Sequence, residues 1–316
     1  MKNGTAHTIL VITLSNIGDA IMTTPVLEAL HRRYPDAMID LVVDRRSSEV
    51  FSHCPYRDRL VFKDKHAGWR GTLDLVRGLR ERHYDLVVDL RTDGLAYLLR
   101  ARRRLTKWQC RAQGPHAVER HIGVIAALES PDIPPTRIWL TPELGHAAAE
   151  RLKTLPGSRW LALGPGANWE PKIWPAARFQ ELVAQLSDAF DAVILLGGPG
   201  DADRCAAVAR SCSLPCLDLA GQTGLLEAAA ILARASIFIG NDSGLGHIAA
   251  AVNTATLTLF GPGQPERYRP WGDKARWLTS PQNDLNRLGV AEVAAQIRSM
   301  CGAHHATCTG VSLAAT

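Results

Sequence analysis

Short runs of apolar, mostly β-branched residues alternate with helical stretches in the first half of the chain, and this order most constrains the fold. The first run is Ile9–Leu14, and a turn at residues 15–19 separates it from a helical stretch that ends near Tyr34. Such runs are typical of strands buried on both faces of a parallel sheet. The βαβα order therefore predicts a doubly wound α/β domain. The other elements expected in this half are strands at Met38–Val43, Arg59–Phe62 and Leu86–Leu90 and a helix at Leu73–Arg82.

The alternation stops at a proline-rich stretch near residues 131–156, which contains one helical run at Pro142–Thr154, and then begins again. A chain of 316 residues is long enough for two domains. We therefore predict two doubly wound domains, residues 1–150 and 151–300, which face each other across a cleft, and a flexible tail at 301–316. The elements expected in the second half are strands at Trp160–Leu163, Ala192–Leu196, Ile237–Ile239 and Thr256–Phe260, and helices at Ala176–Asp188, Ala202–Ser211, Gly224–Arg234, Gly244–Val252 and Val290–Met300.

Composition and charge predict a soluble cytoplasmic protein that does not bind nucleic acid. The net charge of +5 favours anionic partners only mildly and is no nucleic-acid footprint. The seven cysteines are odd in number and form no CxxC pair, which favours reduced thiols over a disulfide framework or a zinc site. The N-terminal apolar run is too short for a signal peptide. The longest segment without a charged residue, Ser243–Pro265, is a poor membrane helix because it contains Gly, Asn, Thr, Pro and His247.

Ligands of doubly wound sheets bind at the carboxyl ends of the strands, so the loops there carry the functional hypotheses. The loop after the first strand, Ser15–Asp19, ends in a carboxylate at the start of a helix. Asp19 either caps this helix, where an acidic residue is favourable, or projects into the cleft as a general base. The loop contains no GxGxxG pattern, which argues against a dinucleotide-dependent dehydrogenase.

The loop Gly164–Pro175 follows the first strand of the second domain. Its glycines allow backbone amides to approach a phosphate, to which Lys172 adds a positive charge. The alternative is an irregular connection with a solvated Lys172. We interpret Trp169 and Trp174 as packing residues.

The loop Gly197–Asp201 also follows a strand, and it ends in a carboxylate. We interpret Asp201 as the residue that holds a ribose hydroxyl, with a surface helix cap as the alternative. Asp201-Ala202-Asp203 also spells the DxD pattern of metal-dependent sugar transferases, but three residues match by chance too easily to carry weight.

In the segment Gly240–Ala251 a strand runs into three polar residues and then into a helix of small side chains. The free amides at the start of such a helix form an anion site. His247 lies in the first turn, beside Asp242 and Ser243, and is either a structural histidine or a ligand contact.

Taken together and in this order, the loops resemble those of the family nine glycosyltransferases, the ADP-heptose:lipopolysaccharide heptosyltransferases. The resemblance spans roughly Ile9 to Pro281. It implies a GT-B architecture, with an N-terminal acceptor domain and a C-terminal nucleotide-sugar domain. The matching pieces are Ile17-Gly18-Asp19 with Thr24-Pro25, Gly164–Trp174, Gly197–Asp201, Asn241–His247 and Leu259-Phe260-Gly261-Pro262.

The resemblance also implies a role for each matching residue. Asp19 matches the catalytic base, Lys172 the lysine at the donor phosphates and Asp201 the residue on the ribose. Ala167 and Asn168 replace paired hydroxyl residues, which weakens the expected hydrogen bonding to the β-phosphate. The acceptor side matches least, because residues 89–94 are only loosely like the acceptor loop. The remaining donor-binding matches are Asp242 on the transferred sugar, Ser243, Gly244 and His247 at the pyrophosphate, and Thr223 and Gly224 at the adenine.

The function expected from the resemblance is an inverting transfer of heptose from ADP-heptose to a hydroxyl of an anionic, lipopolysaccharide-core-type glycolipid. We expect no cofactor and no metal, because the acidic residues are scattered and no His, Cys or carboxylate set has ligand spacing. The alternatives are a GT-B transferase or epimerase that uses a UDP- or GDP-linked sugar, and a non-catalytic nucleotide-sugar-binding protein. The pairing of Asp19 with Lys172 argues against the last.

A run of basic residues in the first domain suggests where such an enzyme works. Such runs are usually solvated, but this one also fits attraction to anionic lipid at the cytoplasmic face of the inner membrane. The run comprises Arg100, Arg102, Arg103, Arg104 and Lys107.

Overall fold

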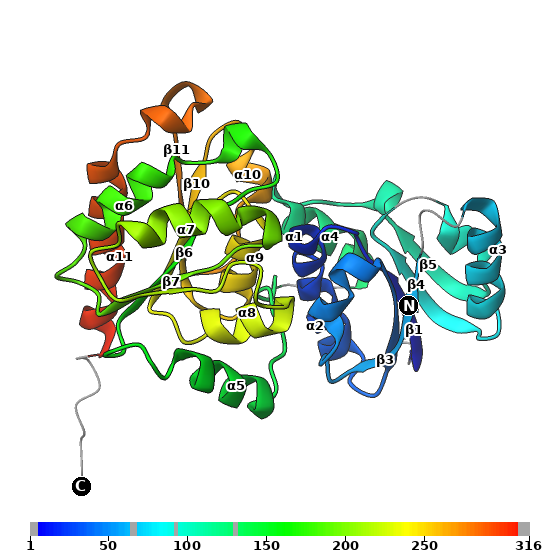
Figure 1. Cartoon of the computed structure of the whole chain (residues 1–316). Helices are drawn as coiled ribbons and strands as arrows, with labels where there is room; N and C mark the ends of the chain where they lie inside the picture. The colour runs from blue at the N-terminus through cyan, green and yellow to red at the C-terminus, as the bar shows by residue number, and fades with distance from the viewer. Residues whose placement is uncertain (1–5, 64–67, 92–93, 129–131, 309–316) are drawn as a thin grey trace, which may run out of the picture. The chain divides into compact units, whose positions relative to one another are not determined.

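The computed structural model describes residues 6–63, 68–91, 94–128 and 132–308, and the chain forms two compact units (Figure 1). Unit 1 comprises the chain up to Gly145 together with Ala250–Val252 and Glu266–Gly272. Unit 2 comprises the rest of the chain. The main division thus lies close to the predicted boundary at residue 150. The two short segments that return to unit 1 carry no signal in the sequence.

Unit 1 is built on a parallel sheet with the strand order β3-β2-β1-β4-β5. The first strand lies in the middle, where Leu10 is in register with both Asp40 and Val87. The chain fills one side of the sheet first and then the other, so the order reverses between β1 and β4. The strands are β1 (Thr8–Ile12), β2 (Met38–Val43), β3 (Arg57–Phe62), β4 (Tyr84–Asp89) and β5 (Ala101–Thr106).

Helices pack on this sheet through apolar side chains. Leu75 and Leu79 of α3 pack in one buried cluster with Leu10 and Val87 of the sheet. The helices that begin in this unit are α1 (Ile17–Ile21), α2 (Thr24–Arg33), α3 (Gly68–Leu79), α4 (Ala117–Ile125) and α5 (Pro142–Leu152), with short 3-10 turns η1 (Arg45–Phe51), η2 (Leu95–Leu98), η3 (Lys107–Gln109) and η4 (Ala126–Leu128).

The helical stretch predicted to run to Tyr34 is two helices, α1 and α2. The hydroxyls of Thr23 and Thr24 donate hydrogen bonds to the carbonyls of Ala20 (2.6 Å) and Ile21 (2.7 Å). Such side-chain bonds compete with the helix, and Pro25 in the first turn of α2 has no N–H to continue the ladder. The break separates the short helix that carries Asp19 from the longer one.

Strand β5 lies at the edge of the sheet, where the sequence analysis predicts only a basic run. The guanidinium of Arg104 donates to the carbonyls of Leu99 (2.6 Å), Ala96 (2.9 Å) and Ala101 (3.1 Å). Arg104 is therefore part of the strand's internal bonding and not a free surface charge. Arg104 therefore does not belong to the predicted set of exposed basic residues. The other four, Arg100, Arg102, Arg103 and Lys107, are exposed.

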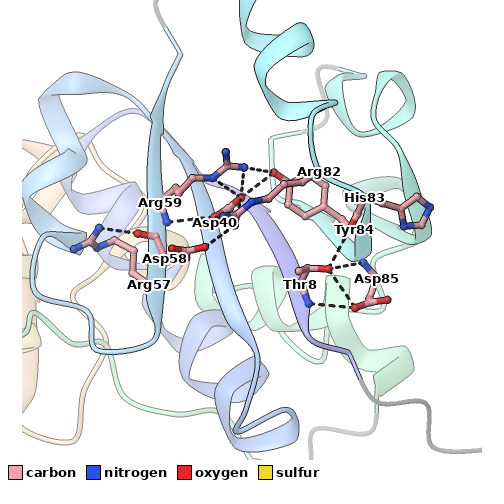
Figure 2. A network of polar contacts seen from close by, with 9 residues as sticks. All are labelled: Thr8, Asp40, Arg57, Asp58, Arg59, Arg82, His83, Tyr84 and Asp85. Atoms are coloured by element: carbon pink, nitrogen blue, oxygen red, sulfur yellow. Dashed lines mark hydrogen bonds and ion pairs between the residues drawn. The ribbon is translucent and has the colours of Figure 1, made fainter.

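A network of charged side chains joins the amino-terminal halves of strands β2, β3 and β4 in unit 1 (Figure 2). Asp40 of β2 is 1% exposed and accepts hydrogen bonds from Arg59 (2.6 Å), Tyr84 (2.9 Å) and Arg82 (3.3 Å). Burial, and the hydrogen bond to Asp40, raise the pKa of the Tyr84 hydroxyl above its ordinary value. Because ligands bind at the opposite ends of parallel strands, this cluster stabilises the sheet.

A segment from late in the sequence completes unit 1. His116, 1% exposed, forms the N-cap of α4, and its Nε2 lies 2.9 Å from the carbonyl oxygen of Arg269. Its ring packs on Trp271 with centroids 4.6 Å apart. Thr136 donates a hydrogen bond to the Trp271 carbonyl at 2.8 Å. Residues 266–272 are thus bonded to elements far earlier in the chain.

Unit 2 repeats the plan with the parallel strand order β11-β10-β9-β6-β7-β8. The order reverses between β6 and β9, where Gly164 is in register with Gly240. The strands are β6 (Trp160–Gly164), β7 (Ala192–Leu195), β8 (Cys216–Asp218), β9 (Ile237–Asn241), β10 (Ala255–Phe260) and β11 (Ala275–Thr279). Of these, β8 and β11 are absent from the prediction, since each is short or half exposed.

The helices of unit 2 pack around a buried core that includes Trp174, Phe179 and Leu288. The last helix continues to Cys308, past its predicted end at Met300, and residues 309–316 of the predicted tail lie outside the described residues. The helices are α6 (Ala176–Gln185), α7 (Ala202–Arg210), α8 (Leu225–Leu232), α9 (Gly244–Ala251), α10 (Pro265–Tyr268) and α11 (Val290–Cys308), with 3-10 turns η5 (Glu170–Lys172), η6 (Pro199–Asp201), η7 (Pro281–Asn283) and η8 (Leu285–Arg287).

The predicted class, α/β with two doubly wound parallel sheets, is confirmed. Across the described ranges, no helix has the length and apolar character that a membrane span requires.

Candidate functional site

The predicted site residues fall on equivalent edges of the two sheets. In unit 1 the order reverses between β1 and β4, and in unit 2 between β6 and β9. Ligands of open α/β sheets bind outside the carboxyl ends of the strands at such a reversal. Asp19 belongs to unit 1, and all the other predicted site residues belong to unit 2.

Asp19 lies in the first turn of α1, directly after β1, and is partly buried. Its Oδ2 accepts a hydrogen bond from the side-chain amide of Asn16 at 2.9 Å. Asn16 occupies the N-cap position, and no side-chain cap bond forms there. The carboxylate of Asp19 is therefore held by a neighbouring side chain and does not cap the helix backbone. An oriented, partly solvated carboxylate is suited to take up a proton.

A buried histidine, absent from the prediction, lies near this carboxylate. The Nδ1 of His121 in α4 is 3.1 Å from the carbonyl oxygen of Met22, the C-cap of α1. Burial lowers the pKa of His121, against smaller raising effects of the Met22 carbonyl and the charge of Asp19. His121 is thus kept neutral while it ties α4 to α1. A histidine on the apolar face of α4 is its only sequence signal.

The loop after β4, on the other side of the reversal, is only partly described. Asp89 ends the strand with 1% exposure, and its Oδ1 accepts a hydrogen bond from the Arg91 amide at 2.9 Å. Gly94, the next described residue, has a φ of +81°, a backbone conformation that favours glycine. Thr92 and Asp93 of the predicted acceptor loop lie outside the described residues.

In unit 2, Asn241 joins the two loops that flank the reversal. It is fully buried at the end of β9. Its side-chain oxygen accepts from the Trp174 amide (3.0 Å), and its nitrogen donates to the Pro165 carbonyl (2.9 Å). These bonds fix both ends of the glycine-rich loop after β6. Asn241 belongs to one of the predicted motifs but has no predicted role, because a buried amide at a strand end has no distinctive sequence pattern.

The Lys172 ammonium lies 2.5 Å from Oδ2 of Asp242, across the same reversal. Their side chains are 24% and 12% exposed. Lys172 is therefore not a solvated surface lysine. The pair places a cation and a carboxylate at one point, where an arriving phosphate would compete for the lysine and leave the carboxylate for a hydroxyl.

The loop after β10 approaches this pair closely, and two glycines permit it. A Cβ at Gly261 would lie 3.0 Å from the Pro171 carbonyl oxygen, and one at Gly263 would lie 2.8 Å from the Phe260 ring and 3.2 Å from Asp242. Three loops of unit 2 thus meet around Lys172 and Asp242.

Asp201 stands at the neighbouring strand end, after β7. Its Oδ2 accepts from the Gly198 amide at 2.9 Å, so the carboxylate caps its own turn. It also fills the space that a side chain at Gly166 would need. Asp201 is also the N-cap residue of α7, but its side chain makes no cap bond to that helix. Contact with a ribose stays a prediction.

The loop after β8 reaches the same region. The Gly221 amide donates to the Gly197 carbonyl at 2.9 Å, and Gly221 has a φ of +70°. This bond brings the following residues, Thr223 and Gly224, toward the Gly197–Asp201 loop, with Gly224 as the N-cap of α8. Contact of these two residues with the adenine stays a prediction.

The start of α9 carries the predicted anion site. Helix α9 begins at Gly244, and His247 in its first turn is 6% exposed. Within the described ranges the buried Oγ of Ser243 has no hydrogen-bond partner. A buried hydroxyl normally has one, so Ser243 is suited to a ligand oxygen.

The residues between the two loop anchors differ in exposure. Ala167 is partly buried and Asn168 is exposed. Trp174 is fully buried against Phe179, as predicted. Trp169 is 52% exposed, so its interpretation as a packing residue is wrong. The loop leaves residues 168 and 169 outside the core.

The part of the chain that the structure describes contains no group of three or more His, Cys, Asp or Glu residues placed to hold a metal ion. In the DxD pattern the Asp201 carboxylate is bonded to Gly198, and Asp203 is exposed. The cysteines whose side chains are described are free thiols.

Comparison with known sequences identifies similar proteins along most of the chain. The sequence model of glycosyltransferase family 9 (heptosyltransferase) matches residues 72–294. Lipopolysaccharide heptosyltransferase 3 of Escherichia coli K12 is 30% identical over 283 residues, 80% of this chain and 82% of its own. Lipopolysaccharide heptosyltransferase 1 of Pseudomonas aeruginosa is 30% identical over 300 residues, which cover 81% and 79%.

Solved structures share the fold. A glycosyl transferase family 9 protein from Veillonella parvula superposes with a TM-score of 0.84 at 23% identity, covering 93% of this chain and 97% of its own. The ADP-heptose lipopolysaccharide heptosyltransferase II of E. coli gives a TM-score of 0.79 at 23% identity, covering 94% and 99%. These likenesses confirm the predicted GT-B fold.

Proposed function

Because this chain belongs to glycosyltransferase family 9, the heptosyltransferases, we propose that it transfers a heptose from ADP-heptose to a lipopolysaccharide-core-type acceptor. The observation that carries the proposal is the Lys172–Asp242 pair, held at the strand-order reversal of unit 2 by the loops that Asn241 fixes. A site for a nucleotide sugar needs a cation for the diphosphate and an acceptor for sugar hydroxyls, and this pair supplies both.

The donor diphosphate binds at Lys172 and the start of α9. Its negative charge draws Lys172 away from Asp242, which is then available to a hydroxyl of the heptose. The amide of Gly244, the orphaned Oγ of Ser243 and His247 face the phosphates. As the bond between the anomeric carbon and the diphosphate oxygen breaks, the departing charge is met by these groups without a metal ion.

The nucleoside end of the donor extends along the next strand ends. Asp201 holds the ribose, and Thr223 and Gly224 contact the adenine. Ala167 and Asn168 line the β-phosphate region but offer fewer hydroxyl donors than a Ser or Thr pair.

Asp19 is the general base. An inverting displacement needs the acceptor hydroxyl to lose its proton as its oxygen attacks the anomeric carbon from the face opposite the diphosphate. The carboxylate of Asp19 accepts this proton, and Asn16 holds it in position. The products are the glycosylated acceptor and ADP.

The acceptor is an anionic glycolipid that unit 1 binds. We place the enzyme in the cytoplasm, in peripheral contact with the cytoplasmic face of the inner membrane, where such a lipid is accessible.

A donor panel tests the proposal. We expect ADP release from ADP-heptose, dependent on acceptor and unchanged by EDTA, and none from UDP- or GDP-linked sugars. Turnover of UDP-N-acetylglucosamine would instead support the UDP-linked alternative, and tight donor binding without turnover a binding protein. Loss of turnover in EDTA that Mg²⁺ or Mn²⁺ restores would revive the metal interpretation of Asp201-Ala202-Asp203.

A further inference from the structure

The basic surplus of the whole chain is concentrated in one segment of unit 1. Residues 97–120 contain seven basic side chains and one acidic side chain, a net charge of +6, whereas the whole chain carries +5. Within the described ranges, none of these cations forms a salt bridge. The cations are Arg100, Arg102, Arg103, Arg104, Lys107, Arg111 and Arg120.

Large apolar side chains stand exposed among these charges. Trp108 is 68% exposed, and Tyr97 and Leu98 are each 52% exposed. The rings of Tyr97 and Trp108 stack on each other with centroids 5.8 Å apart and an interplanar angle of 23°. Two stacked aromatic rings beside a leucine form an apolar projection and not scattered exposure.

Rigid elements present this projection. Tyr97 and Leu98 belong to η2, whose backbone carbonyl at Ala96 is bound by Arg104 of β5 (2.9 Å). Trp108 belongs to η3, which follows β5 directly. Both turns are therefore fixed to the edge strand, and the rings need no ordering on contact with a partner.

Two more cations follow η3 closely, Arg111 in the segment before α4 and Arg120 within α4. The amide of Arg111 donates to the Gly123 carbonyl (3.0 Å), and the Cys110 thiol donates to the Arg120 carbonyl (3.0 Å). A Cβ at Gly123 would lie 2.7 Å from the backbone of Ala112, so only glycine permits this close approach. Arg111 and Arg120 thus lie on adjacent chain segments.

We propose that this edge patch is a docking surface for an anionic lipid bilayer. We define the edge patch as Tyr97, Leu98, Trp108 and the exposed cations Arg100, Arg102, Arg103, Lys107, Arg111 and Arg120. Tyr97, Leu98 and Trp108 enter the interfacial region, and the cations contact lipid phosphates. Aromatic rings favour that region, and each basic residue near an anionic surface adds to binding.

The chemistry favours a bilayer over nucleic acid. Tyr97 and Trp108 stack on each other, and Leu98 has no π-face, so the projection is better suited to acyl chains than to bases. A bilayer surface also accepts cations along the whole edge strand without a fixed register.

The position of the patch relates it to the reaction. Thr106, at the end of β5, is in register with Asp89, which is in register with Ile12 at the end of β1. Lys107 and Trp108 therefore follow the same carboxyl edge of the sheet as Asp19. A bilayer held at this edge would present a lipid-linked acceptor to unit 1; this consequence rests on the proposed function, whereas the docking itself does not.

Vesicle binding of the full chain, without donor, tests the proposal. We expect co-sedimentation with vesicles of phosphatidylcholine and phosphatidylglycerol, and little with phosphatidylcholine alone. Trp108→Ala should weaken binding about tenfold. The control Trp69→Ala removes an equally exposed tryptophan of unit 1, 69% exposed, and should change nothing.

The charge contribution is tested in the same assay. The double variant Arg100→Gln/Arg102→Gln should weaken binding about fivefold per residue. Arg210→Gln/Arg234→Gln removes the same charge from exposed positions of unit 2 and should bind as wild type does. Equal losses in both double variants would reduce the effect to net charge and overturn the proposal.

A second measurement follows Trp108 itself. Brominated lipids should quench part of the tryptophan fluorescence of the wild type, and Trp108→Phe should remove that part while binding persists. No quenching, or a single-stranded oligonucleotide that displaces the protein from vesicles, would overturn docking to a bilayer. Activity on a soluble acceptor does not depend on these outcomes, so failure here leaves the proposed function intact.

Discussion

The carboxyl edges of the two sheets share a topology but differ in how tightly their loops are bound together. In unit 2 the loops are cross-linked by Asn241, by the Lys172–Asp242 pair and by glycines that allow backbone approach within van der Waals distance. In unit 1 the corresponding edge offers Asp19 on a short helix, held by one exposed amide, Asn16. In unit 1 a densely hydrogen-bonded carboxylate, Asp40, lies instead in the amino-terminal half of its strand.

Under the proposed function, this difference matches what each edge binds. A nucleotide diphosphate is the same in every turnover and rewards a preorganised site. A general base needs to contact only the acceptor hydroxyl, which is part of a much larger molecule. A few oriented groups are therefore enough to hold the base in position. In this interpretation, the rigid loops of unit 2 increase the affinity for the donor, and one carboxylate of unit 1 accepts the proton in the reaction.

The largest effect is expected at Asp19. Asp19→Asn keeps size and hydrogen bonding but removes basicity, so kcat should fall by about 10²–10⁴-fold, with donor affinity and folding unchanged. Steady-state kinetics and calorimetric titration with donor measure both quantities. Asp36→Asn, an exposed aspartate in the same unit, is the matched control. Near-normal turnover of Asp19→Asn, together with an inactive Asp242→Asn that still binds donor, would reverse the two assignments.

The opposite end of unit 1 should respond in stability and not in catalysis. Asp40→Asn weakens the bonds to Arg59, Arg82 and Tyr84. Breaking a buried ion pair costs about 3–5 kcal/mol, and the partial exposure of both arginines reduces this to about 2–3 kcal/mol. Urea unfolding should show this loss, with kcat unchanged where the protein is folded. Asp58→Asn, which removes only the outer partner of Arg82, should cost less than about 1 kcal/mol. A large fall in kcat for folded Asp40→Asn would contradict the separation of the two ends.

In unit 2, Lys172→Ala should lower kcat/KM by about 10- to 100-fold, since hydrogen bonds to charged groups contribute about 1.5–3 kcal/mol. The loss should appear in both KM and kcat, because the cation matters more as the diphosphate departs. Lys153→Ala, which removes an exposed lysine paired with Glu150, serves as the control. Wild-type kinetics for Lys172→Ala would show that the lysine only pairs with Asp242 and does not contact the donor.

The smallest effect concerns pH and the buried His121 of unit 1. Burial lowers its pKa below 6.5. Between the folded pKa and pH 6.5, His121 is therefore protonated in the unfolded chain but not in the folded chain. This contribution to stability is present above pH 6.5 and is lost as pH falls from there toward the folded pKa. Urea midpoints across that range should therefore fall less in His121→Gln than in the wild type. His146→Gln, at an exposed position, should keep the wild-type slope. Equal slopes in all three proteins would remove His121 from the acid response.

The strands that the sequence predicts best are those in which apolar residues predominate. Met38–Val43 is predicted with its observed bounds. β5 is missed because half of its residues are arginine and only Leu105 and Thr106 are buried. No local pattern shows that Arg104 bonds to the carbonyls of η2, since those bonds exist only after the turn has folded.

The candidate site is predictable at positions where the residue type alone indicates the chemistry. Lys172, Asp242 and Asp19 stand out as charges at strand ends. Asn241 and His121 do not, because their roles depend on which backbone carbonyl or amide lies nearby in three dimensions. The misjudged Trp169 belongs to the same class: whether a tryptophan packs depends on the path of its loop.

The late segment that completes unit 1 has a consequence for how the protein is made. Until residue 272 is synthesised, Trp271 cannot pack on His116, and the α4 surface with Met22, Ala117 and Val118 lacks part of its cover. Ribosomes add about 5–20 residues per second, so the first unit waits on the order of ten seconds after its main segment is complete. The nascent first half therefore exposes an apolar surface for that interval, which is long enough for a chaperone to bind.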